Sequence, residues 1–241
     1  MDLWFYGLAL VAYLLPLLAR RAGSQGERLE RVPLQAIGAA LHVCGIAWAA
    51  VAMGRLPMDS MQWGLAALSL LVVAGGALLR GPRMTSAADL LGPIAVLLLA
   101  TSFVAPGVAE AGERTSTWVP VHVVLVFAGL ASFAVSFSLS FLYLVVRRRL
   151  KDRRLDGIAR LPALDTLDQL NFRAMGIGFV TLTAGMGVVG VAALTLTETP
   201  MEPDITVYAT AGVWVWYAIA LQLRIVSGWR GKRAAIFGVV G

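Results

Sequence analysis

The stretch Trp118–Lys151, "WVPVHVVLVFAGLASFAVSFSLSFLYLVVRRRLK", decides the fold class. It has no charged residue from Trp118 to Val146, and it then ends in a basic cluster. A helix needs about 20 apolar residues to cross the hydrocarbon core of a bilayer, so this stretch predicts a membrane-spanning helix. It also contains one ionisable group, His122, and such groups within a span usually have a functional reason.

The composition of the whole chain agrees with this prediction. Of 241 residues, 59% are hydrophobic and 14% are charged, whereas a typical soluble domain has about 25% charged residues. The mean hydropathy is +0.77. We therefore expect an all-α, polytopic helical protein that is integral to a lipid bilayer.

The sequence lacks the motifs of several common catalytic and binding sites. Cys44 is the single cysteine, so no internal disulfide forms. There is no CxxCH motif for covalent haem attachment and no paired Cys/His spacing for zinc. The motifs HExxH and GxSxG and a Gly-rich phosphate loop are also absent. We therefore expect no catalytic residues, no metal site and no enzymatic activity.

The apolar segments predict seven full spans and a partial eighth. The last apolar segment, Ala234–Gly241, rises only about 12 Å as a helix, which is too short to cross. No tandem repeat or low-complexity linker divides the chain, so residues 1–241 are expected to form a single membrane domain. The seven full spans are Leu3–Ala19, Val32–Gly54, Gln62–Leu79, Leu90–Ala109, Trp118–Val146, Ala174–Thr197 and Ile205–Leu223.

The basic residues predict the orientation. Of the 20 Lys and Arg residues, all but Arg55 and Arg114 fall in four loops on one side of the predicted spans. Basic loops stay in the cytoplasm, so the N-terminus is expected outside. The same rule accounts for the net charge of +6 without a nucleic-acid partner. The four loops are residues 20–31, 80–89, 147–173 and 224–233.

The inner loop after the fifth span contains the segment "IARLPALDTLDQLN". Leu161, Leu164 and Leu167 share one side of a helix, whereas Asp165 and Asp168 lie elsewhere on it. This pattern predicts a short amphipathic helix that lies at the inner interface, separate from the sixth span.

His122 lies on a stripe of small residues along the fifth span. At 100° per residue, His122, Gly129, Ser136 and Ser140 fall on one face of the helix. Small residues allow close helix contact in lipid, where burying apolar surface gives no net drive. The stripe is therefore expected to face protein, with Gly129, Ser136 and Ser140 in structural roles.

His42 repeats the arrangement in the second span, where it shares a face with Gly38 and Gly45. Each histidine could make a packing hydrogen bond, contact a ligand or relay protons. His122 lies roughly 6 Å below the outer end of its span and His42 roughly 18 Å below. This difference in depth argues against one shared haem iron. It favours His122 as the ligand contact and His42 as a residue that holds helices together.

Four segments resemble blocks of the cytochrome c assembly family, the group of CcsA, CcmC and HemX. The similarity is strongest over residues 118–235, and the small branch of HemX and YpjD type is the most similar. The segments are Trp118–Lys151, "LPALDTLDQLNFRAMGIGFVTLTAG" with Arg173, "SGWRGKRAA" with Trp229, and "ALHVCGIAWAA" with His42.

The resemblance implies a haem-associated assembly factor, accessory to cytochrome c biogenesis, in the inner membrane of a bacterium. It implies haem as a ligand, His122 and His42 as candidate haem ligands, and other cytochrome c maturation proteins as partners. Arg173 and Trp229 would be structural residues of the family blocks.

Two departures from the family pattern limit that role to an accessory one. Haem-handling members carry a Trp-rich outer motif between histidines, but here the outer loop between spans six and seven reads "LTETPMEPD". Gln222 stands where those members have a histidine. The alternatives are a HemX-like scaffold that regulates tetrapyrrole synthesis through its basic inner face and a small transporter. A transporter should show internal repeats with interrupted spans, and Pro93 in the fourth span is one candidate interruption for which we identify no counterpart.

Overall fold

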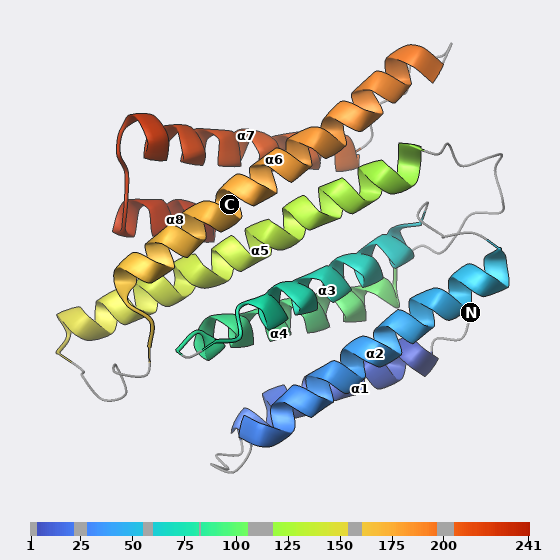
Figure 1. The fold of residues 1–241 in the computed structure, drawn as a ribbon, viewed down its shortest axis with the longest axis horizontal. Helices are drawn as coiled ribbons and strands as arrows, with labels where there is room; N and C mark the ends of the chain where they lie inside the picture. Colours follow the sequence, from blue (N-terminus) through green and yellow to red (C-terminus); the bar gives the residue numbers. More distant parts are fainter. Residues whose placement is uncertain are drawn as a thin grey trace. The chain divides into compact units, whose positions relative to one another are not determined.

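The computed structural model describes residues 4–21, 28–54, 60–81, 83–105, 118–153, 161–196 and 205–241. Within these ranges the chain is helical and contains no strand (Figure 1). Residues Met1–Ala74 and Gly92–Ser116 form one compact unit, here unit 1, and Gly75–Leu91 and Thr117–Gly241 form unit 2. The helices are α1 Trp4–Arg21, α2 Arg28–Met53, α3 Met61–Leu78, α4 Thr85–Ser102, α5 Trp118–Lys151, α6 Leu164–Leu196, α7 Ile205–Val226 and α8 Lys232–Val240.

Six helices in the described part of the chain are long and apolar enough to cross a membrane. They make this a multi-pass membrane protein, as the composition predicts. The apolar part of α1, Trp4–Leu18, is shorter. Each of the eight predicted apolar segments overlaps a helix of the structure. The count of seven full crossings and the position of the N-terminus outside the membrane stay predictions. The six helices supply Leu34–Met53, Met61–Leu78, Thr85–Ser102, Trp118–Lys151, Leu164–Ala192 and Ile205–Val226.

Unit 1 is built on the antiparallel pair of α1 and α2. Glycines on α2 leave room for aromatic rings on α1: a Cβ at Gly38 would lie 2.6 Å from the Tyr13 ring, and one at Gly45 would lie 3.2 Å from the Tyr6 ring. The Ser69 hydroxyl on α3 donates a hydrogen bond of 2.8 Å to the Ala95 carbonyl on α4. The core consists of Tyr6, Ala9, Tyr13, Ala49, Trp63, Ala66 and Leu99.

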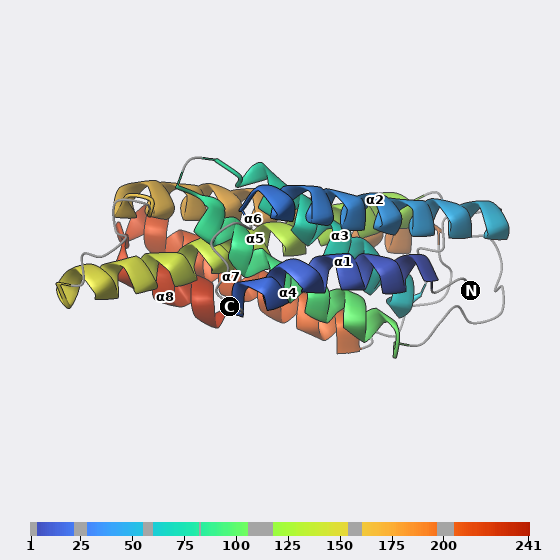
Figure 2. The same cartoon turned by 90° about the horizontal axis from the view of Figure 1, so that it is seen from below.

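Unit 2 is built on the antiparallel pair of α5 and α6 (Figure 1). Glycines let the two backbones approach closely, because a Cβ at Gly129 would lie 3.0 Å from the Gly178 carbonyl oxygen. In both views α8 lies beside α5 (Figure 2). There Gly238 faces the Ser140 hydroxyl and Gly231 faces the Tyr143 hydroxyl. The stripe of small residues on α5 thus contacts both α6 and α8.

The prediction of a separate amphipathic helix before the sixth span is wrong. α6 is one continuous helix of 33 residues that begins at Leu164. Leu167 is fully buried in the core of unit 2, and Asp168 is paired with Arg224. The segment therefore satisfies its apolar and charged side chains inside the protein and does not need the membrane interface.

The predicted bounds of the fourth span are also wrong. The helix begins at Thr85 rather than Leu90 and ends at Ser102, followed by a turn to Ala105. The charge of Asp89 places the predicted start of the span at Leu90, but Ala87 and Ala88 before it are buried. Burial of these small residues extends the helix toward the turn after α3. Residues 106–109 lie outside the described part of the chain.

Candidate functional site

His122 lies near the start of α5, and its imidazole is oriented by α6. Its Nδ1 lies 2.8 Å from the backbone carbonyl oxygen of Gly185. A carbonyl only accepts hydrogen bonds, so Nδ1 carries the hydrogen and donates it. In a neutral imidazole, Nε2 then keeps an unshared electron pair. The ring is half-buried, so α6 holds one nitrogen and leaves the other available to a ligand.

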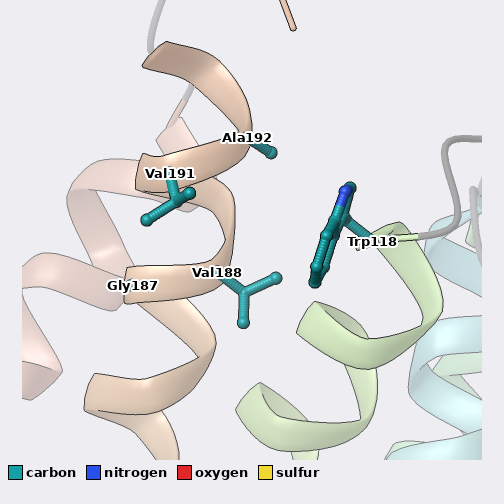
Figure 3. Close-up of a pocket in the computed structure, with 5 residues that line it drawn as sticks. All are labelled: Trp118, Gly187, Val188, Val191 and Ala192. Atoms are coloured by element: carbon teal, nitrogen blue, oxygen red, sulfur yellow. The ribbon is translucent and has the colours of Figure 1, made fainter. Parts of the chain in front are cut away.

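An apolar pocket of about 290 Å³ lies at the same end of the α5–α6 pair (Figure 3). Trp118 on α5 stands one helical turn before His122. The side chains of Val188 and Ala192 on α6 point toward the Trp118 ring. Small-molecule pockets usually measure about 300–1,000 Å³, so this one can hold the edge of a large flat ligand but cannot enclose it. Its lining is Trp118, Gly187, Val188, Val191 and Ala192.

His122 and the pocket lie about one helical turn apart along both α5 and α6. Gly185, which accepts the hydrogen bond from His122, is two residues before Gly187, which lines the pocket. α6 thus supplies both the hydrogen-bond acceptor for His122 and one wall of the pocket. The sequence shows that the sixth span is rich in glycine, but it does not show which residues of α5 these glycines meet.

The predicted structural residues of the α5 stripe lie in the interior of unit 2. Gly129 faces the backbone of Gly178 and Leu182 on α6. The Ser136 hydroxyl donates a hydrogen bond of 2.6 Å to the side-chain oxygen of Asn171. Ser140 is fully buried, and its hydroxyl finds no hydrogen-bond partner among the described residues.

His42 occupies the interior of unit 1 and is fully buried. Its Nδ1 makes a long contact of 3.5 Å with the Tyr13 hydroxyl, and its ring meets the Tyr6 ring edge-on at 5.4 Å. The backbone of Ala66 on α3 lies close enough to interact with the imidazole. The Nε2 atom nevertheless makes no hydrogen bond of good geometry with the described residues. His42 thus joins α1, α2 and α3 in a packed core.

The two histidines belong to different units. Their roles as haem ligands stay predictions. The described residues also contain no group of three or more His, Cys, Asp or Glu side chains that could hold a metal ion.

Arg173 and Trp229, the other predicted structural residues, lie in unit 2. Arg173 is exposed on α6. Trp229 is half-buried in the turn between α7 and α8. The Arg233 guanidinium lies 5.3 Å from the centre of the Trp229 ring, and Phe237 meets this ring at 5.7 Å. Trp229 thereby packs the turn onto α8, and the structural role of Arg173 stays a prediction.

A buried ion pair between Asp168 and Arg224 was missed by the sequence analysis. Two guanidinium nitrogens of Arg224 donate to the Asp168 carboxylate at 3.0 and 2.7 Å. The Gly231 amide donates to the same carboxylate at 2.9 Å, and the guanidinium lies 4.7 Å from the centre of the Phe172 ring. The pattern of charges along the sequence predicts Asp168 and Arg224 in two different inner loops. The available signal was an arginine between Leu223 and Ile225, inside an apolar run.

Comparison with known proteins gives a family match over most of the chain. The family described as Cytochrome C assembly protein matches residues 43–241. Proteins named Cytochrome c biogenesis protein CcsA are similar in sequence. The one from Synechococcus elongatus is 26% identical over 229 residues, with 75% of this chain and 69% of the relative covered.

Two further CcsA proteins match shorter parts. The one from Chlamydomonas reinhardtii is 29% identical over 130 residues, with 52% of this chain and 35% of the relative covered. The one from Thermosynechococcus vestitus is 34% identical over 85 residues, with 35% of this chain and 27% of the relative covered. The chain therefore spans between about a quarter and about two thirds of the length of these relatives.

Proposed function

The chain belongs to the cytochrome c assembly protein family, and from this premise we propose that it is a haem-associated assembly factor, accessory to cytochrome c biogenesis. The predicted resemblance to this family is confirmed, whereas a place in its HemX branch stays a prediction. The proposal puts the protein in the inner membrane of a bacterium, where other cytochrome c maturation proteins are its partners.

The observation that carries the proposal is the hydrogen bond from His122 to Gly185. Neutral imidazole is a common ligand of haem iron. A histidine ligand usually donates its other ring nitrogen to a carboxylate or backbone carbonyl, which fixes the tautomer and orients the ring. His122 already has this arrangement. The residues present therefore fit haem, and the free Nε2 of His122 would hold its iron.

The surroundings of His122 fit the same ligand. The apolar pocket beside it, with Trp118 on one wall, would exclude water from the edge of a macrocycle. Haem would supply the iron for coordination, while His122, Trp118 and α6 bind and orient it.

Replacing His122 by alanine is expected to abolish the Soret band that haem addition produces in the purified protein. The melting temperature should fall by little, because the half-buried ring makes one hydrogen bond to α6. His42→Ala is the matched control. It should keep the band but lower the melting temperature, because it removes a fully buried side chain from the core of unit 1.

Two outcomes would contradict this assignment. If His42→Ala loses the band and His122→Ala keeps it, the assigned roles are reversed. If the wild-type protein shows no Soret band at any haem concentration, the haem-ligand proposal is wrong for this chain.

The orientation of the chain is the second part of the proposal. We expect Ser116, just before α5, to be outside and Asp152, just after it, to be inside. In a Cys44→Ser background, an impermeant thiol reagent added to intact cells should label Ser116→Cys and leave Asp152→Cys unlabelled. Labelling of Asp152→Cys alone would mean that the orientation is inverted.

A further inference from the structure

The turn between α3 and α4 brings two arginines to one membrane surface. Both flanking helices are apolar and long enough to cross, so the turn lies at the level of the lipid headgroups. Arg80 is half-buried, whereas Arg83 is exposed and adopts the left-handed conformation, with φ of 74°. A non-glycine residue in this conformation is uncommon and is typical of a turn.

Arg80 is a partly desolvated cation that has no counter-ion among the described residues. Burial lowers the pKa of its guanidinium, because removal from water penalises the charged form. No carboxylate in the described ranges forms a salt bridge with it. Even partial removal of a charge from water has a cost that a paired anion offsets, so an anion from outside the chain would stabilise Arg80 at this half-buried position.

The turn is held against the end of α5. Leu79, Met84 and Ala87 pack in one cluster with Tyr143 and Val146 of α5. The 34 residues of α5 rise about 51 Å, well beyond the ~30 Å hydrocarbon core. The basic residues after Val146 therefore extend beyond the hydrocarbon on the same side as the turn.

α8 begins at this end as well, because Gly231 contacts the Tyr143 hydroxyl. The carboxylates nearby that the structure describes already have partners: Asp168 binds Arg224, Asp165 accepts from Gln169, and Asp152 lies 3.8 Å from Arg148. Asp89 also has an interaction of its own. Positive charge is thus in excess here. The exposed cations are Arg83, Arg147, Arg148, Arg149, Lys151, Arg153, Arg230, Lys232 and Arg233.

We propose that the α3–α4 turn binds the phosphate of an anionic phospholipid, with Arg80 as the central contact and Arg83 beside it. A lipid fits better than a free anion, because Leu78, directly before the turn, is 89% exposed and offers an apolar surface to an acyl chain. Arginine suits this ligand, because its planar fork of donors matches phosphate oxygens. This site is independent of the proposed haem function.

The test measures lipid binding by the purified full-length protein. In mixed detergent micelles, fluorescent phosphatidylglycerol should bind more tightly than the same probe with a phosphatidylcholine headgroup. Arg80→Gln should weaken phosphatidylglycerol binding about fivefold, since a basic residue near anionic lipid contributes about 1 kcal/mol. Arg80→Lys should retain part of the affinity. Arg148→Gln is the matched control and should change the affinity by less than about twofold, because Arg148 is exposed and lies near Asp152.

Three results would overturn this proposal. Equal binding of the two lipids by the wild type would show no headgroup recognition. Equal weakening by Arg80→Gln and Arg148→Gln would assign the effect to the general positive charge of this end. Displacement of the lipid by inorganic phosphate at millimolar concentration would show that the site takes a free anion. If Arg80→Gln does not fold, the same comparison is made with Arg83→Gln.

Discussion

Replacing Asp168 by asparagine is expected to destabilise the protein by about 3–5 kcal/mol, the usual effect of removing one partner of a buried ion pair. The side chains of Arg224 and Asp168 are only 8% and 11% exposed. The variant leaves the Arg224 guanidinium buried without a countercharge. It also weakens the acceptor of the Gly231 amide, so α7 and the turn into α8 lose a shared anchor on α6. Thermal unfolding in detergent measures the effect.

The exposed ion pair at the end of α5 provides the control. Arg148 and Asp152 lie 3.8 Å apart, with side chains 86% and 45% exposed. Surface pairs contribute about 0–1 kcal/mol, so Arg148→Gln should leave the melting temperature nearly unchanged. The double variant Asp168→Asn with Arg224→Gln should regain part of the lost stability, because it also removes the unpaired charge. Losses that simply add would mean that the two residues do not interact.

Gly129→Leu is expected to have the second large effect, a loss of about 3 kcal/mol, which is the upper part of the range for overpacked interiors. A Cβ at Gly129 would lie 3.0 Å from the Gly178 carbonyl oxygen and 3.1 Å from the Leu182 amide nitrogen. These are backbone atoms of α6 and cannot rotate away. The two helices must therefore separate, and the hydrogen bonds from His122 to Gly185 and from Ser136 to Asn171 should weaken with them.

Gly176→Leu is the matched control, because a Cβ at Gly176 meets no other atom within 4 Å. Both variants add the same side chain to a glycine of the α5–α6 pair, so they share the change in helix propensity. Only Gly129→Leu should lower the melting temperature strongly and reduce haem binding. Equal melting temperatures would mean that α5 and α6 do not pack closely at Gly129.

The amino-acid sequence alone determined the class of the protein. Apolar runs such as Trp118–Val146 are long enough to cross a bilayer, and this property depends only on residues that are neighbours in the chain. The similarity of Trp118–Lys151 and Ser227–Ala235 to the cytochrome c assembly family also lies in local blocks of sequence. The periodicity of small residues placed Gly129 and Ser136 on one face of α5 without any knowledge of the partner helix.

Only the tertiary structure decided which residues meet. Asp168 lies 56 residues before Arg224, and His122 lies 63 residues before Gly185. No periodicity within a helix encodes such pairs, because they arise when helices far apart in the chain pack together. The same packing made α6 continuous: a charge that predicts a surface helix can instead lie inside the protein once a second helix supplies its counter-ion. Charge and hydropathy are properties of a residue, whereas burial and pairing are properties of the fold.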